Sequence, residues 1–212
     1  MKLHSFGMFF ATCCMITITA CDQSANQNTS TSFAVNTSED SKKEALFRKV
    51  SVSESGIDFI NRLEETPELN IINYHYFYNG GGVAAGDLNQ DGLIDLYFTS
   101  NQGADKLYIN QGDLKFEDHS DKLPPKSEKS WSTGVLMADL NGDGLLDIYL
   151  SMSGRLPKDQ RKNRLLINYG DLEFKEEAKA YGLDDAAYST QAAVLDYDQD
   201  GDLDLFLLNH EI

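Results

Sequence analysis

The chain has 212 residues, of which 41% are apolar and 10% aromatic, enough for one domain or two small ones with a real core. Eighteen Lys and Arg against 34 Asp and Glu give a formal net charge of −16, which argues against binding to nucleic acid or to an anionic membrane surface. The three cysteines lie at positions 13, 14 and 21, so a disulfide framework in the folded part is excluded.

The segment 1–20 has the pattern of a secretory signal peptide. Lys2 and His4 precede an uncharged run over residues 6–20, which is too short to span a bilayer comfortably and long enough for a signal-peptide core. The run ends in Ile-Thr-Ala before Cys21, and these residues resemble the lipobox at which bacteria acylate a cysteine and cleave the chain before it. An ordinary signal peptide followed by a chance cysteine is the alternative.

Lipidation of Cys21 would anchor the mature protein in the bacterial cell envelope, and we expect no other membrane contact. Two acyl chains suffice for stable anchoring. Asp22, directly after the cysteine, is an inner-membrane retention signal in only some bacteria, so we expect the outer membrane or the cell surface. Residues 21–45 are rich in Ser, Thr, Asn and Gln and cannot bury enough apolar surface to fold, which predicts a flexible tether.

A nine-residue string occurs three times in the rest of the chain. The copies are DLNQDGLID at 87–95, DLNGDGLLD at 139–147 and DYDQDGDLD at 196–204, and they follow one another at nearly equal intervals. A second string, LYINQGDLKFE after Lys106 and LLINYGDLEFKE after Arg164, repeats between them. Residues 46–212 therefore consist of repeats of about 50 to 58 residues.

Each complete repeat predicts four β-strands. Short apolar stretches flank every acidic string, at 82–86 and 96–99, 134–138 and 148–151, and 191–195 and 205–208. Runs this short, bounded by turns, are typical of buried strands. The second string places Gly-Asp between two apolar runs, which favours a hairpin. Four-stranded units at this period predict an all-β fold, a β-propeller whose blades pack around a central channel.

The acidic strings predict calcium-binding loops. Oxygen-bearing side chains at positions 1, 3, 5 and 9 of a tight turn converge, and their carboxylates repel one another unless a cation lies among them. Hard oxygen ligands favour Ca²⁺, and a backbone carbonyl at position 7 together with water would complete its shell. The glycine at position 6 permits the positive φ that folds such a loop. A metal-free turn rich in Asp, Asn and Gly is the alternative.

Two other calcium-loop families are set aside. An EF-hand needs a Glu at position 12 and flanking helices, whereas position 12 here is Phe98, Leu150 or Leu207, inside an apolar run. Dockerin repeats also lead into a helix. The acidic strings are therefore predicted to connect strands.

The calcium loop between strands, with the later Leu-x-Ile-Asn-x-Gly-Asp-x-x-Phe hairpin, resembles the FG-GAP/VCBS repeat family, which includes the seven-bladed propeller of integrin α subunits. The stretches at 56–61, 78–98 and 189–206 are also similar to secreted bacterial proteins in which such a propeller often precedes an ASPIC/UnbV domain. The resemblance covers residues 46–212 and implies about three Ca²⁺ per chain. The implied ligands are Asp87, Asn89, Asp91, Leu93 and Asp95; Asp139, Asn141, Asp143, Leu145 and Asp147; and Asp196, Asp198, Asp200, Asp202 and Asp204, with the position-7 residues acting through their carbonyls.

No catalytic constellation is visible in the sequence. The four histidines are scattered, no cysteine follows Cys21, and there is no nucleophile-elbow or phosphate-loop pattern. We therefore expect a binding or adhesion module for a protein or a polysaccharide, calcium-stabilised and extracytoplasmic, rather than an enzyme. The alternative is the propeller portion of a carbohydrate-active enzyme such as a polysaccharide lyase, with its catalytic residues outside this chain.

Three further expectations concern the packing of the blades. The aromatic stretch 73–79 favours strand packing, with a glycan-binding surface as the alternative. Trp131 and Tyr188 occupy the same position relative to the first Asp of the loop that follows each of them, which predicts packing between blades. The third repeat lacks the hairpin string, so the chain is expected to be a fragment of two and a half to three blades of a larger ring, seven-bladed by the resemblance, with an unpaired apolar edge.

Overall fold

The structure, a computed structural model, describes residues 46–127 and 129–211. Of these, residues 47–127 and 129–211 belong to the unit Phe47–Ile212. The predicted signal peptide, the lipidation site at Cys21 and the predicted tether lie outside the described residues. Within the described ranges, no helix is long and apolar enough to cross a bilayer.

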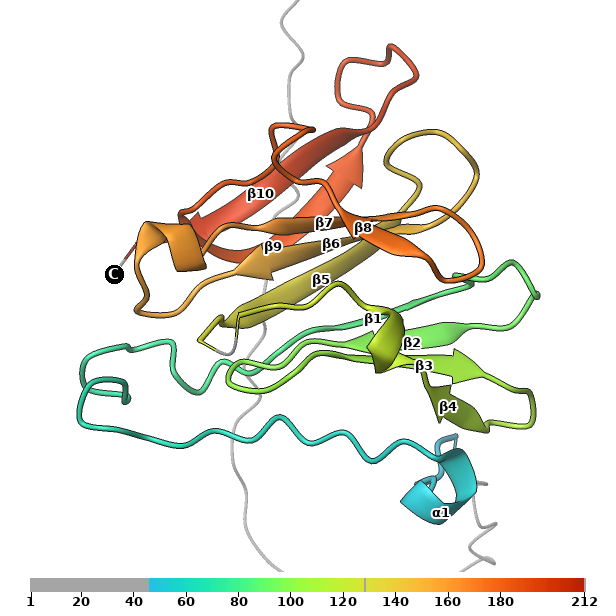
Figure 1. Cartoon of the computed structure of the whole chain (residues 1–212), viewed down its shortest axis with the longest axis horizontal. Coiled ribbons are helices and arrows are strands. Elements are labelled where there is room, and N and C mark those ends of the chain that lie inside the picture. The colour runs from blue at the N-terminus through green and yellow to red at the C-terminus, as the bar shows by residue number, and fades with distance from the viewer. Residues whose placement is uncertain (1–45, 128, 212) are drawn as a thin grey trace, which may run out of the picture. The chain divides into compact units, whose positions relative to one another are not determined.

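Ten strands in the described part of the chain form three antiparallel sheets (Figure 1). The first sheet contains, side by side in chain order, β1 (Val83–Gly86), β2 (Asp95–Phe98), β3 (Lys106–Asn110) and β4 (Phe116–Asp118). The second contains, in the same order, β5 (Ser132–Ala138), β6 (Asp147–Met152), β7 (Arg164–Asn168) and β8 (Phe174–Glu176). The third contains β9 (Tyr188–Leu195) and β10 (Asp204–His210). The two four-stranded sheets confirm the predicted blades, and the third repeat has the two strands expected of it.

Each acidic string closes the first hairpin of its sheet at the same register. The pairs that flank the strings are Gly86 with Asp95, Ala138 with Asp147, and Leu195 with Asp204. Every string therefore starts directly after the last paired residue of one strand and ends on the first paired residue of the next. Each acidic string therefore connects two strands. EF-hand and dockerin loops need flanking helices, so their exclusion is confirmed.

The sheets pack face to face with their first strands side by side, β1 next to β5 and β5 next to β9 (Figure 1). The cluster between the first and second sheets includes Tyr97, Leu107, Leu150 and Leu166. The cluster between the second and third includes Tyr149, Leu165, Ala192 and Leu205. Every residue of β6 is buried because a sheet covers each of its faces. This is the arrangement of adjacent blades in a partial β-propeller.

The third sheet is covered on one face only in the described part of the chain. Leu205 and Leu207 of β10 pack against the second sheet. The alternate residues Phe206 and Leu208 are 62% and 54% exposed. Because successive side chains of a strand point to opposite faces, this alternation places one apolar row of β10 in the core and leaves the other in solvent.

The residues before β1 run along the first sheet. The single turn α1 (Val52–Ser55) is capped by Ser51 and ends at Gly56, which has a φ of 79°. Phe59 then stacks on Phe98 of β2, with ring centroids 5.0 Å apart. The connections between strands contain two 3-10 turns, η1 (Ser120–Lys122) and η2 (Lys158–Gln160).

The aromatic stretch 73–79 is not a strand, so that part of the expectation is wrong. It forms consecutive turns. The side-chain oxygen of Asn70 accepts the N–H groups of Ile72 and Asn73 in the first turn, and the backbone bonds Phe77 N–H to Tyr74 O (3.0 Å) and Asn79 N–H to Tyr76 O (3.1 Å) form the next. Such local bonds compete with sheet pairing. The aromatic rings nevertheless pack: Tyr74 and Phe77 are buried against Trp131, with ring centroids 5.5 and 5.4 Å from the Trp131 ring.

Trp131 and Tyr188 both pack at boundaries between repeats, as their equivalent positions predicted. Trp131 immediately precedes β5 and is 2% exposed. The ring of Tyr188, the first residue of β9, lies 3.7 Å from the guanidinium carbon of Arg161. Arg161 belongs to the connection between β6 and β7, so this contact joins the third repeat to the second.

Candidate calcium loops and an axial cavity

The three acidic loops lie at one end of the sheets. Each connects the first two strands of its sheet, and Figure 1 shows them on the same side as the β3–β4 and β7–β8 turns. An antiparallel meander produces this placement, since its first and third connections emerge at the same end. The loops of successive blades are therefore neighbours at that end.

The first two loops share one hydrogen-bond pattern. In the first loop, the carboxylate of Asp87 accepts the backbone N–H groups of Asp91 (3.2 Å) and Gly92 (2.8 Å). Asp139 accepts the corresponding groups, at 3.1 and 2.8 Å, in the second loop. The repeated pattern shows that the position-1 carboxylate organises the turn whatever residue occupies position 4, which is Gln90 in one loop and Gly142 in the other.

In each loop, a hydrogen bond from the backbone N–H of position 7 to the side chain of position 5 fixes the place of position 7. The N–H groups of Leu93, Leu145 and Asp202 donate to the side chains of Asp91, Asp143 and Asp200, at 2.8, 2.8 and 3.0 Å. The side-chain oxygen at position 3 accepts the N–H of position 5 in the same three loops, at 3.2, 3.0 and 3.3 Å. Positions 3, 5 and 7 of each loop are therefore held in one tight turn.

Two residues of each loop have a positive φ. The glycine at position 6 has φ values of 84°, 88° and 96° at Gly92, Gly144 and Gly201, as predicted. Position 4 is also left-handed, at 60°, 77° and 62° for Gln90, Gly142 and Gln199. The sequence did not indicate this second position, because glutamine is not a residue that left-handed backbone favours.

The last aspartate of the first two loops is buried and ties the loop to the third strand of the sheet. Asp95 accepts the N–H of Leu88 within its loop and the N–H of Asn110 at the end of β3, both at 2.9 Å. Asp147 accepts those of Leu140 and Asn168, at 3.0 and 2.9 Å. Burial raises the pKa of both carboxyl groups above its ordinary value, and the two backbone N–H bonds oppose that shift.

The third loop brings its carboxylates closest together. Oxygens of Asp196, Asp198 and Asp204 all lie within 4.8 Å of one another, and the three residues are exposed. Asp204 accepts the N–H of Tyr197 (2.8 Å), which corresponds to the bond within the first two loops. A group of oxygen-only donors at this spacing fits a hard cation such as Ca²⁺.

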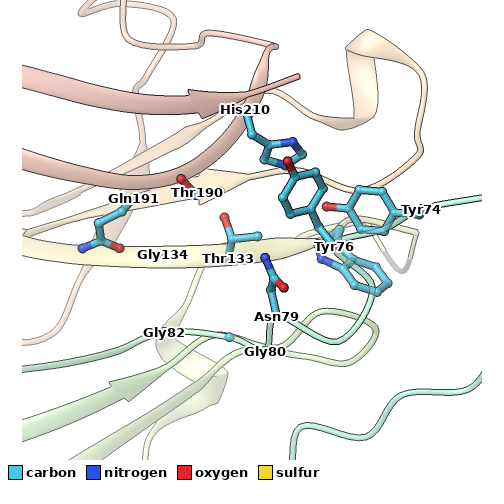
Figure 2. A pocket seen from close by; sticks show the side chains of 12 residues that line it. Tyr74, Tyr76, Asn79, Gly80, Gly82, Thr133, Gly134, Thr190, Gln191 and His210 are labelled. Carbon is cyan, nitrogen blue, oxygen red and sulfur yellow. The ribbon is translucent and has the colours of Figure 1, made fainter. Parts of the chain in front are cut away.

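At the opposite end of the sheets lies a cavity of about 240 Å³ (Figure 2). Its walls include the residues at the start of β1, β5 and β9, the turn segment 74–79, and His210 at the end of β10. Sequence reasoning missed this cavity. The available signal was the run Gly80-Gly81-Gly82, whose last two members are equivalent by the repeat spacing to Thr133-Gly134 and Thr190-Gln191.

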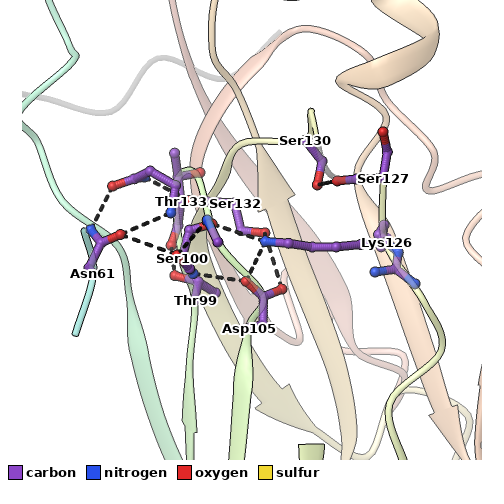
Figure 3. A network of polar contacts seen from close by, with 12 residues as sticks. Asn61, Thr99, Ser100, Asp105, Lys126, Ser127, Ser130, Ser132 and Thr133 are labelled. Atoms are coloured by element: carbon purple, nitrogen blue, oxygen red, sulfur yellow. Dashed lines mark hydrogen bonds and ion pairs between the residues drawn. The ribbon is translucent and has the colours of Figure 1, made fainter. Parts of the chain in front are cut away.

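A buried polar network joins the first and second sheets near that end (Figure 3). The Nζ of Lys126 donates to Oδ1 of Asp105 (2.6 Å) and to the hydroxyl of Ser132 (2.9 Å). The hydroxyl of Thr99 donates to the carbonyl oxygen of Thr133 (2.5 Å). These bonds supply partners to polar groups that the close approach of the two sheets removes from water.

Comparison with known proteins identifies the repeat. Residues 87–150, from the first loop to β6, match the family model described as FG-GAP-like repeat. Cartilage acidic protein 1 of Mus musculus and of Homo sapiens are each 30% identical to the chain over 138 residues, covering 63% of this chain and 21% of the relative. The Xenopus tropicalis protein of the same name is 29% identical over 140 residues, covering 64% and 21%. The chain therefore spans about a fifth of the length of these curated relatives.

The match confirms the resemblance to FG-GAP repeats, and the sheets confirm the all-β propeller class. FG-GAP repeats form propellers, commonly bind calcium and generally belong to binding or adhesion modules rather than enzymes. The matched range contains the first two acidic loops completely. The third lies beyond it and is connected to the others by its spacing and register.

Proposed function

We propose that the chain is part of a calcium-stabilised, extracytoplasmic β-propeller that binds a protein or a polysaccharide and is tethered to the cell envelope through lipidated Cys21. The observation that carries the proposal is the construction of the same acidic loop three times at one end of adjacent blades. The loops lie at the end of the sheets opposite the cavity. We therefore assign calcium stabilisation to the loop end and ligand binding to the cavity end.

Calcium would be held by the side chains at loop positions 1, 3, 5 and 9 and by the carbonyl at position 7. These are the residues implied by the resemblance, in the ranges Asp87 to Asp95, Asp139 to Asp147 and Asp196 to Asp204. The ion supplies positive charge that offsets the repulsion among the loop carboxylates. The chain's own contribution is the tight turn that presents these oxygens together.

Calorimetry with Ca²⁺ on the chelator-stripped chain tests the metal assignment. We expect uptake of about three ions per chain, since there are three loops of one design. Asp143→Ala should abolish one site and leave the other two. Asp159→Ala is the matched control, because Asp159 is an exposed aspartate outside the loops and its loss should leave the stoichiometry unchanged. No heat of binding in the unsubstituted chain would refute the calcium assignment.

The third loop is expected to bind Ca²⁺ most tightly. It contains five aspartates, at 196, 198, 200, 202 and 204, against three in each of the others, and Ca²⁺ affinity rises with ligand charge. Asp198→Ala should therefore remove the highest-affinity phase of the titration. If that phase survives and Asp143→Ala removes it instead, the second loop is the tighter site.

The tether is tested by fractionation of bacterial cells. Cys21→Ser should release the protein from the membrane fraction after a salt wash, since the acyl chains are the proposed anchor. A variant that stays as firmly membrane-bound as the unsubstituted protein would rule out lipidation at Cys21.

Binding and catalysis are separated by incubating polysaccharides with this chain and, in parallel, with a longer protein that contains it. A binding module retains the intact polymer in both samples, whereas the lyase alternative predicts that the longer protein shortens it. Size-exclusion chromatography of the polymer after incubation distinguishes retention from cleavage.

A further inference from the structure

The axial cavity is built from equivalent positions of all three repeats. Gly82, Gly134 and Gln191 occupy one position, because they follow one another at the same intervals as the acidic loops. The first two repeats place no side chain there, which leaves room between the starts of β1, β5 and β9. The third places a carboxamide, whose oxygen would lie 2.0 Å from a Cβ added at Gly134.

One wall of the cavity is a fixed aromatic pair. The rings of Tyr76 and His210 lie with centroids 3.8 Å apart and an interplanar angle of 34° (Figure 2). The His210 ring is within 3.1 Å of the Ser153 hydroxyl, which is itself 3.0 Å from the hydroxyl of Tyr74. These bonds hold the His210 ring against the second sheet, and Tyr76 is placed by its stacking on that ring, so the wall is formed before any ligand arrives.

The described residues that line the cavity include no Asp, Glu, Lys or Arg, although a quarter of the chain is charged. Its polar side chains include amides and hydroxyl groups. Among the described residues, the side chain of Asn79, the hydroxyl of Tyr76 and the carboxamide oxygen of Gln191 make no hydrogen bond, and Gln191 uses only its NH₂ group. Free neutral donors and acceptors beside an aromatic wall favour an uncharged ligand that is rich in hydroxyl groups.

We propose that this cavity binds one pyranose ring of a neutral saccharide, an inference that rests on the proposed binding function and specifies its ligand class. Pockets for drug-sized molecules measure about 300–1,000 Å³, and this cavity is smaller. A single sugar ring matches it better than a chain of rings. Asn79 and Gln191 bind the ring hydroxyl groups from opposite sides, and Tyr76 offers its hydroxyl and ring edge.

Trp131 makes the proposal directly measurable. It is the only tryptophan of the chain, it is buried, and it lines this cavity. Binding of a sugar ring should therefore change the tryptophan emission in a saturable way. The probes are the neutral trisaccharides cellotriose, maltotriose, mannotriose and N,N′,N″-triacetylchitotriose. Trigalacturonate is the charged comparison and a tyrosine-containing tripeptide is the peptide comparison.

We expect at least one neutral trisaccharide to give a saturable change, and neither trigalacturonate nor the tripeptide to do so. Asn79→Ala and Gln191→Ala should each weaken that binding about tenfold, the loss of one or two neutral hydrogen bonds. Asn79 is exposed and its side chain makes no hydrogen bond among the described residues, so Asn79→Ala should melt like the unsubstituted chain. Gln191→Ala loses one bond to the carbonyl oxygen of Val135 (3.3 Å) and should lower the free energy of unfolding by about 1 kcal/mol at most. Gln111→Ala is the matched control, because Gln111 is an exposed amide in the β3–β4 turn at the opposite end.

The proposal is overturned if no neutral trisaccharide changes the emission, if only trigalacturonate or the tripeptide does, or if the two cavity variants bind as tightly as Gln111→Ala. Failure of the broader function is a separate result. If immobilised polymer retains the unsubstituted chain and both cavity variants equally, the binding module stands and the cavity is not its site. If calorimetry shows no Ca²⁺ uptake, the calcium assignment fails whatever the cavity binds.

Discussion

The Nζ of Lys126 lies 2.6 Å from Oδ1 of Asp105, and the two side chains are only 9% and 4% exposed. Burial lowers the pKa of Lys126 from its ordinary value, and the neighbouring carboxylate opposes that shift. In the next interface, the residue equivalent to Asp105 is Asn163, whose amide donates to Ser189 at 2.9 Å. One blade interface thus uses an ion pair where the next uses a neutral hydrogen bond.

Asp105→Asn should lower the free energy of unfolding by about 3–5 kcal/mol, because it leaves the Lys126 ammonium buried without its partner. The double variant Asp105→Asn/Lys126→Leu should recover most of this loss. It combines the amide found at Asn163, the residue equivalent to Asp105, with an apolar side chain in place of the ammonium group. Urea unfolding measures both. Asp184→Asn, which breaks the exposed pair with Lys162, serves as the control and should shift the midpoint little. Equal stability of the single and double variants would contradict the prediction.

Asp147→Ala should destabilise the chain in the presence of a chelator by about 2–4 kcal/mol, since two backbone N–H groups lose a charged acceptor. Asp204→Ala is the matched comparison at position 9 of the third loop. Asp204 is exposed and accepts one backbone N–H, so its loss should matter less. Chemical unfolding in EDTA isolates this structural role from any effect on Ca²⁺. The prediction fails if the two variants are equally destabilised.

Gly134→Ala should destabilise the chain by about 1–3 kcal/mol through overpacking, because the new Cβ would lie 2.4 Å from the backbone oxygen of Thr190. Gly112→Ala is the contrasting change. It meets no atom within 4 Å but has a φ of 83°, so its cost of about 1–2 kcal/mol is conformational. Only Gly134→Ala should alter the emission of Trp131, which lines the same cavity. An unchanged spectrum would show that β5 and β9 absorb the methyl group without moving.

Tyr149→Phe should make the chain more resistant to alkali. Burial raises the pKa of Tyr149 from 10.0 to about 12, so above pH 10 the folded state holds a proton that the unfolded state has released. Tyr149 therefore makes the free energy of unfolding fall as the pH rises between these values, by up to about 3 kcal/mol. The variant removes this contribution and leaves that of Tyr108, whose pKa is also raised to about 12. At neutral pH the free energy of unfolding of Tyr149→Phe should be about 1 kcal/mol lower than that of the unsubstituted chain. The variant loses the hydrogen bond from the Tyr149 hydroxyl to the carbonyl oxygen of Leu183, at 2.9 Å.

The measurement is the unfolding free energy of both proteins at neutral pH and at several values between pH 10 and 12. Identical slopes would show that Tyr149 ionises in the folded state as readily as in the unfolded chain. Tyr169→Phe provides a control for an exposed tyrosine whose hydroxyl donates to Glu177 instead.

The sequence alone determined the features that a short stretch of chain can encode. The acidic loops, their position between strands and the left-handed glycine follow from nine consecutive residues, in which Asp and Asn side chains bond backbone N–H groups two to five positions away. The hairpins after Lys106 and Arg164 follow in the same way from Gly-Asp between apolar runs. The repeat spacing then predicted the blades, because four short strands per unit have few other ways to bury their apolar faces.

The sequence pattern predicted the wrong element where local hydrogen bonds competed with strand pairing. Aromatic residues over 73–79 favoured a strand, yet the side chain of Asn70 bonds the backbone at Ile72 and Asn73, and backbone bonds between residues three apart continue the turns to Asn79. Nor did the nine-residue strings distinguish the buried Asp95 and Asp147 from the exposed Asp204. That difference depends on a third strand, whose backbone at Asn110 and Asn168 donates to the first two aspartates.

Only the tertiary structure decided where the cavity lies. Gly82, Gly134 and Gln191 belong to three different repeats, and they meet because β1, β5 and β9 pack side by side. The same packing sets the turn segment with Tyr76, which precedes the first sheet, against His210 at the end of the last strand. Contacts of this range depend on which sheet faces are buried together, and no spacing within a single repeat specifies them.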